Sequence, residues 1–163
     1  MHIVDGALSN PVVIGGALAA AGGVAKGLRS LDLESIPTAG VLSASFFVAS
    51  LIHVPIGPSS VHLILNGLAG LLLGWAAFPA LFVGLLLQAV FVGFGGLTVL
   101  GINTLNLALP AVMAGLLFRP MIGRGVPVAG AVWGGLGGVF AIAATTIMVG
   151  ASLALSGDQF LPA

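Results

Sequence analysis

The chain begins with a residue pair that can chelate a metal ion, Met1-His2. The α-amine, the amide nitrogen of His2 and the imidazole of His2 can close two fused rings around one ion. An all-nitrogen, roughly planar set of this kind suits Ni(II) or Cu(II), and imidazole more generally suits several first-row metals. The alternative is a histidine at a frayed end, because termini that nothing anchors are commonly disordered.

The other two histidines, His53 and His62, flank a short segment in which Pro55, Gly57 and Pro58 interrupt any helix. We expect His62 to lie in the first turn of the following helix, where its imidazole would supply a fourth ligand. The alternative is a histidine that is hydrogen-bonded at a helix start or at the headgroup interface. For His53 three roles remain open: an axial ligand, a group that orients the other ligands, or an interfacial residue.

Four polar residues in otherwise apolar segments are candidates to support the ligands through hydrogen bonds: Ser60, Asn66, Gln88 and Asn103. Polar side chains inside a membrane are costly, so each one requires a reason. Asn66 follows His62 by one turn of the predicted helix, and we expect it to bond the imidazole or the amino-terminal segment. For Gln88 and Asn103 we expect ligand support or helix packing rather than direct ligation.

The composition is that of a membrane protein. Apolar residues make up 59% of the chain and charged residues 5%, and the mean hydropathy is +1.26. A soluble domain carries about a quarter charged residues. The absence of cysteine excludes disulfides and thiolate metal sites. No basic cluster is present to hold nucleic acid, and no soluble catalytic motif is found, so we do not expect an enzyme.

We predict an all-α, polytopic membrane helix bundle of about six transmembrane helices, since a span takes roughly 20 apolar residues. We expect a single transmembrane domain over residues 1–163, with a candidate metal-chelating amino-terminal segment at 1–9; that it binds a substrate is implied by the resemblance described below. The predicted helices cover residues 11–28, 38–53, 59–75, 79–98, 104–118 and 126–155.

The four basic residues orient this bundle. Lys26 and Arg29 follow the first predicted helix, and Arg119 and Arg124 follow the fifth. With six spans both pairs fall on one side, which the positive-inside rule assigns to the cytoplasm. The amino terminus therefore lies outside, folded into the bundle, and all three histidines map to the outer face.

The chain resembles the substrate-binding (S) component of nickel/cobalt energy-coupling-factor (ECF) transporters, the CbiM/NikM family. Three stretches carry the resemblance in the family's order: residues 1–9 (MHIVDGALS), 54–62 (VPIGPSSVH) and 88–104 (QAVFVGFGGLTVLGINT). The family commonly has asparagine where His53 stands, and commonly a seventh helix that this chain lacks.

The resemblance implies a site built from the Met1 amine, the His2 amide and imidazole, and the His62 imidazole. Its substrate would be Ni(II) or Co(II), captured outside the cell (inner) membrane for an ABC-type importer, with no organic cofactor; cobalt uptake would serve cobalamin synthesis. The implied partners are a transmembrane coupling (T) protein, two ATP-binding cassette ATPases that hydrolyse ATP, and in many systems a small accessory membrane subunit. The alternatives are an S component or carrier for a non-metal solute, a structural subunit of a membrane complex, and, less favoured, a membrane metalloenzyme.

Overall fold

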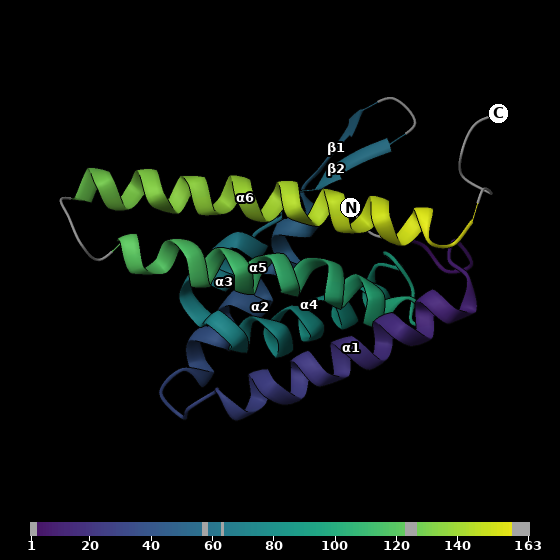
Figure 1. Ribbon diagram of the computed structural model, residues 1–163, viewed down its shortest axis with the longest axis horizontal. Helices are drawn as coiled ribbons and strands as arrows, with labels where there is room; N and C mark the ends of the chain where they lie inside the picture. The colour runs from purple at the N-terminus through teal and green to yellow at the C-terminus, as the bar shows by residue number, and fades with distance from the viewer. Residues whose placement is uncertain (1–2, 57–58, 63, 123–126, 158–163) are drawn as a thin grey trace.

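The computed structural model describes residues 3–56, 59–62, 64–122 and 127–157, with the backbone alone for residues 53–62. It is a helical bundle (Figure 1), which confirms the predicted all-α class, and it carries one short β-hairpin. The helices are α1 (Asn10–Arg29), α2 (Ile36–Leu51), α3 (Asn66–Leu73), α4 (Ala77–Phe91), α5 (Leu100–Ile122) and α6 (Pro127–Ala154). A 3-10 helix, η1 (Gly74–Ala76), joins α3 to α4, and the hairpin strands are β1 (His53–Ile56) and β2 (Ser59–His62).

The described part of the chain contains 4 helical stretches long and apolar enough to cross a membrane. The first is α1, the second is the continuous run Asn66–Phe91 (α3, η1 and α4), and the third and fourth are α5 and α6. Helix α2 is apolar but shorter. The protein is therefore a multi-pass membrane protein, although the predicted number of six spans is not confirmed.

The predicted third helix, 59–75, is wrong in its first half. Residues 59–62 form β2, paired antiparallel with β1, and the helix begins only at Asn66. Pro55, Gly57 and Pro58 disfavour a helix here, and β-branched residues such as Val54 and Val61 favour extended backbone. His62 therefore ends a strand instead of opening a helix, and it does not share a helical face with Asn66.

The predicted fourth helix, 79–98, also ends too late. α4 stops at Phe91 because the loop that follows contains three glycines with positive φ: Gly93 (71°), Gly95 (81°) and Gly96 (141°). Side chains rarely adopt such backbone conformations, whereas glycine does so at little cost. The remaining predicted helices differ from α1, α2, α5 and α6 only at their ends.

Helix α5 lies at the centre of the bundle, in contact with α1, α3, α4 and α6. Its inner residues pack with Phe46, Phe78 and Leu81 from α2 and α4. The closest approach is to α3, where a Cβ on Gly70 would overlap the backbone carbonyl of Ala111. Small residues permit such backbone contact between membrane helices, where close packing replaces the hydrophobic effect as the driving force.

The basic residues gather at one end of the bundle. Lys26 Nζ lies 3.6 Å from the centroid of the Trp75 ring, and Arg119 Nη1 lies 4.0 Å from the position that a Cβ on Gly74 would occupy. In Figure 1 the ends of α1 and α5 that carry these residues both lie at the left. The prediction of a shared basic side is confirmed for Lys26, Arg29 and Arg119, while Arg124 lies outside the described residues. The positive-inside rule predicts that this end faces the cytoplasm.

Candidate functional site

The amino-terminal segment is held against the first turn of α5 by two reciprocal hydrogen bonds. The Ile3 N–H donates to Asn103 Oδ1 at 3.1 Å, and Asn103 Nδ2 donates to the Ile3 carbonyl at 2.9 Å. Ile3 is 4% exposed and Asn103 is 3% exposed. One carboxamide therefore satisfies both backbone groups of the residue that follows His2, as a neighbouring strand would.

Asp5 provides a second attachment, to the loop between α4 and α5. Its carboxylate accepts hydrogen bonds from the Thr98 hydroxyl and from the Val99 N–H, and its own N–H donates to the Gly95 carbonyl at 3.1 Å. A Cβ on Gly96 would overlap the carboxylate. Negative charge is favourable beside the amino-terminal end of a helix, here α5. This docking role of Asp5 was not identified from the sequence.

Apolar contacts complete the docking of this segment. Ile3 and Leu8 form a buried cluster with Val99 and Ile102 at the beginning of α5. Residues 3–8 are thus folded into the bundle at the end opposite the basic residues, as predicted.

The predicted histidine ligands can be compared only at the level of the backbone. Met1 and His2 lie outside the described residues, as do the side chains of His53, Ser60 and His62. The register of the hairpin pairs His53 with His62 across the two strands. Within the described side chains no group of three His, Cys, Asp or Glu residues is placed to hold a metal ion, so the proposed ligand set remains a prediction.

Asn66 joins three helices at the beginning of α3. Its Nδ2 donates to the Leu107 carbonyl at 3.2 Å and to Thr145 Oγ1 at 2.9 Å, and its Oδ1 accepts from the Gly67 N–H at 2.9 Å. Asn66 is 0% exposed. The carboxamide therefore has hydrogen-bond partners in α5, α6 and α3. It joins helices by hydrogen bonds, which is a common role of polar groups in membrane helices.

Gln88 differs from the two asparagines. It is 0% exposed, and neither Nε2 nor Oε1 has a hydrogen-bond partner among the described residues. Its backbone carbonyl accepts from the Val92 N–H and the Phe94 N–H, at 3.0 and 3.3 Å, so its position at the end of α4 is well determined. Gln88 lies at the base of the loop to which Asp5 is bonded.

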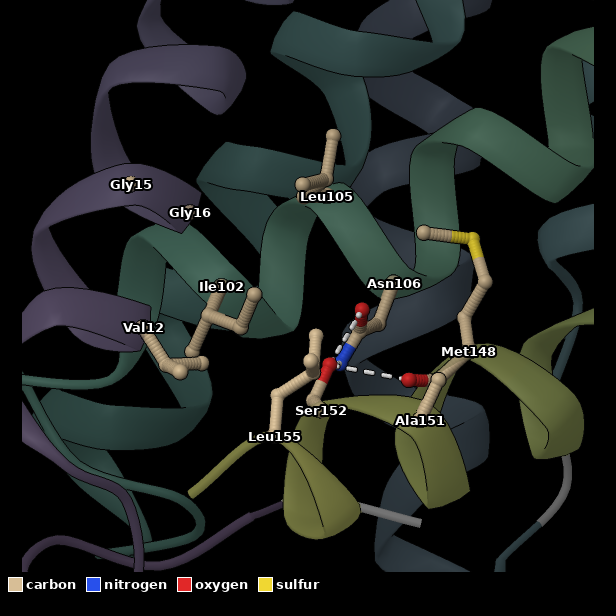
Figure 2. Close-up of a pocket in the computed structure, with 10 residues that line it drawn as sticks. All are labelled: Val12, Gly15, Gly16, Ile102, Leu105, Asn106, Met148, Ala151, Ser152 and Leu155. Carbon is tan, nitrogen blue, oxygen red and sulfur yellow. Dashed lines mark hydrogen bonds between the residues drawn. The ribbon is translucent and has the colours of Figure 1, made fainter.

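A groove of about 340 Å³ lies beside the docked segment, over α5 and between α1 and α6 (Figure 2). Its lining is apolar except at the floor, where Asn106 and Ser152 bond each other: Asn106 Nδ2 donates to Ser152 Oγ at 3.1 Å. No described residue of the predicted metal site lines this groove. Asn106 and Ser152 join α5 to α6, and each has the other as its hydrogen-bond partner.

Comparison with known proteins agrees with this architecture. The family model described as "CbiM: Cobalt uptake substrate-specific transmembrane region" matches residues 2–163. A putative metal transport protein of Haemophilus influenzae is 54% identical over 119 residues, which cover 73% of this chain and 58% of that protein. The fused nickel transport protein NikMN of Rhodobacter capsulatus is 37% identical over 135 residues, covering 78% of this chain and 39% of the relative.

A solved structure shows the same arrangement. It is described as a truncated transition metal transporter and superimposes with a TM-score of 0.71 at 30% identity, covering 92% of this chain and 74% of that one. This chain spans 58% and 39% of the length of the two curated relatives. On the match of the family model over residues 2–163, the chain belongs to the CbiM family, the cobalt uptake substrate-specific transmembrane region.

Proposed function

We propose that the protein is the substrate-binding component of an ECF-type importer and captures Ni(II) or Co(II) at the outer face of the cell (inner) membrane. The ligands would be the Met1 amine, the His2 amide and imidazole, and the His62 imidazole, with His53 as a further candidate. The observation that carries the proposal is the pair of hydrogen bonds between Ile3 and Asn103. They hold the residue that directly follows the chelating pair.

This contact supports the chelate because it tethers the residue next to His2, which disfavours the frayed-end alternative. Consecutive Cα atoms are about 3.8 Å apart, so the backbone of His2 must begin within that distance of the buried Ile3. A tethered chelate loses less chain entropy when it closes around an ion than a free terminus would.

A second tether supports His62 as a ligand. Asn66 follows His62 by four positions, and four residues of chain span at most about 14 Å. Asn66 is bonded to the Leu107 carbonyl, one turn of α5 beyond Asn103. Ile3 and Asn66, which follow the two predicted ligand segments, are therefore bonded to adjacent turns of α5, about 6 Å apart along its axis.

The proposed assembly follows from the family. We propose a transmembrane coupling protein, two ATP-binding cassette ATPases and a small accessory membrane subunit as partners, with ATP hydrolysis supplied by the ATPases. This chain itself would not be an enzyme. The metal transport names of the relatives from Haemophilus influenzae and Rhodobacter capsulatus favour a metal substrate over a non-metal solute.

The test is Ni(II) and Co(II) titration calorimetry on the detergent-purified chain, with parallel absorption spectra. The native terminus is compared with a form that carries Gly-Ser-Gly before Met1. Three residues are needed because a single added glycine would place histidine third and build a different nitrogen chelate. The same extension at the carboxyl end is the control.

We expect tight binding by the native chain and by the control, and loss of it in the amino-terminal extension. Equal binding by both extended forms would show that the ion binds elsewhere and would contradict the terminal chelate. No binding by any form would contradict the metal-capture function and favour the structural-subunit alternative.

A further inference from the structure

Gln88 has a buried carboxamide without a hydrogen-bond partner among the described residues. Burial of such a group without a partner is unfavourable in any protein and more so within a membrane, where water does not replace the missing bonds. The side chain of Ser43 in α2 has the other unpartnered oxygen found in the described part of the chain. A buried polar group of this kind in a membrane helix is a candidate for a functional role.

The other buried carboxamides provide the comparison. Asn66 bonds α5 and α6, Asn103 bonds the backbone of Ile3, and Asn106 bonds Ser152. Each of these three holds elements of the bundle together. The side chain of Gln88 makes no hydrogen bond to any of the described elements. A partner for it would have to come from outside the described residues.

The position of Gln88 points to the amino-terminal segment. It lies three residues before the end of α4, and Asn103 lies three residues after the beginning of α5. At 1.5 Å per residue both are about 4.5 Å inside the helix ends that one loop connects. Gln88 and Asn103 therefore both lie close to the loop that connects the two helices, and Asn103 bonds the residue next to His2.

The helical face of Gln88 agrees with this placement. Leu81 and Leu85 precede it by seven and three residues and share its side of α4. Both pack in the core with Leu107 and Ala108 of α5. The next turn of α5 toward its beginning carries Asn103 and Thr104. The face of α4 on which Gln88 lies is thus directed at the part of α5 that binds the amino-terminal segment.

We propose that Gln88 is a positioning residue for the metal site: its carboxamide oxygen accepts a hydrogen bond from an N–H of a nitrogen ligand when the ion is bound. This inference rests on the proposed function. Without the ion the carboxamide has no hydrogen-bond partner among the described residues, and its burial is then unfavourable. Loading the ion brings the missing donor, so the hydrogen bond forms only in the loaded state and adds to metal affinity.

The experiment compares Gln88→Met with Ser43→Ala and Gln88→Glu in the full-length chain in detergent. Gln88→Met removes the carboxamide at similar volume, Ser43→Ala removes the other unpaired group away from the site, and Gln88→Glu keeps the acceptor oxygen. For each we would measure the Tm without metal, the Kd for Ni(II) and the absorption spectrum of the Ni(II) complex.

We expect Gln88→Met to weaken Ni(II) binding about 10- to 100-fold, the usual effect of removing a group that orients a ligand. Its metal-free Tm should equal or exceed that of the wild type, because an unpaired buried group is lost. The Ni(II) spectrum should change in Gln88→Met. Ser43→Ala should bind as the wild type, and Gln88→Glu should recover most of the affinity.

Wild-type affinity in Gln88→Met would overturn the inference and leave the proposed function standing. Failure of Gln88→Met to fold, or a fall in its metal-free Tm, would show that the carboxamide has a structural partner and would also overturn it. Weak binding that Gln88→Glu does not restore would have the same meaning. If the wild type itself binds no metal, the proposed function and this inference fail together.

Discussion

The contact between Asn103 and Ile3 allows a direct test of how the amino terminus is held. Asn103→Leu removes both hydrogen bonds at nearly constant volume. A net hydrogen bond contributes about 0.5–1.5 kcal/mol, so two contribute about 1–3 kcal/mol. The freed backbone groups of Ile3 regain partners in water if the segment detaches, and we therefore expect release of residues 1–8 before global unfolding.

The effect on metal binding follows from the population of the docked segment. When only a fraction of molecules is competent to bind, the apparent Kd rises by the inverse of that fraction. A loss of about 1–3 kcal/mol corresponds to a decrease in affinity of about 5- to 140-fold. Titration calorimetry measures this directly, and digestion by an aminopeptidase reports the release of the segment.

Asn106→Leu is the matched control for this prediction. Asn106 is also a buried asparagine of α5, and it exchanges two hydrogen bonds with Ser152 at 3.1 and 3.2 Å. We expect a comparable decrease in Tm for the two variants but a loss of metal affinity only in Asn103→Leu. Equal affinity in both variants, or equal resistance to the aminopeptidase, would refute the argument that Asn103 holds the terminus.

Two further predictions follow from the site and the packing. His2→Ala and His62→Ala should each abolish high-affinity Ni(II) or Co(II) binding, with a smaller effect for His53→Ala. Titration calorimetry measures these affinities. Submicromolar affinity retained in both of the first two variants would contradict the ligand set. Gly70→Val should prevent folding, because its side chain would overlap the backbone of α5, whereas Gly15→Ala enters open space; size-exclusion profiles and yields of the two variants check this, and a folded Gly70→Val protein would contradict the close packing.

Most of the helical framework could be predicted because apolar runs bounded by charges or prolines determine where membrane helices lie. α1 and α6 differ from their predicted ranges by one residue at either end. The hairpin could not be predicted in the same way. The run from Ser59 to Leu73 has no break in its sequence that would mark a boundary between a strand and a helix. Residues 59–62 form a strand because they pair with β1, and this pairing is a tertiary contact.

The candidate site could be proposed from residue types, but the contacts of its supporting residues could not be predicted. Asn103 could be identified as a supporting residue because it is a polar group within an apolar segment. Its partner Ile3 is 100 residues away in sequence, so the bond depends on tertiary structure. The docking role of Asp5 was missed for the same reason. Asn66 was expected near His62 on one helix, and this was wrong because the helix begins later.

The contact of Lys26 with Trp75 bears on how far an ion would have to travel. Tryptophan and lysine side chains favour the boundary between headgroups and hydrocarbon, so this pair marks the inner boundary. The 20 residues of α1 span about 30 Å, the thickness of the hydrocarbon layer, which puts the outer boundary near Asn10. Ile3 and Asn103 then lie within a few ångströms of external water. An ion bound there would have crossed almost none of the barrier, and nearly the whole hydrophobic thickness would remain beneath it, filled by the packed side chains of Phe46, Phe78 and Leu107. Capture there would not require the ion to cross the hydrocarbon layer, so in the proposed importer the energy of ATP hydrolysis would be needed for the inward step.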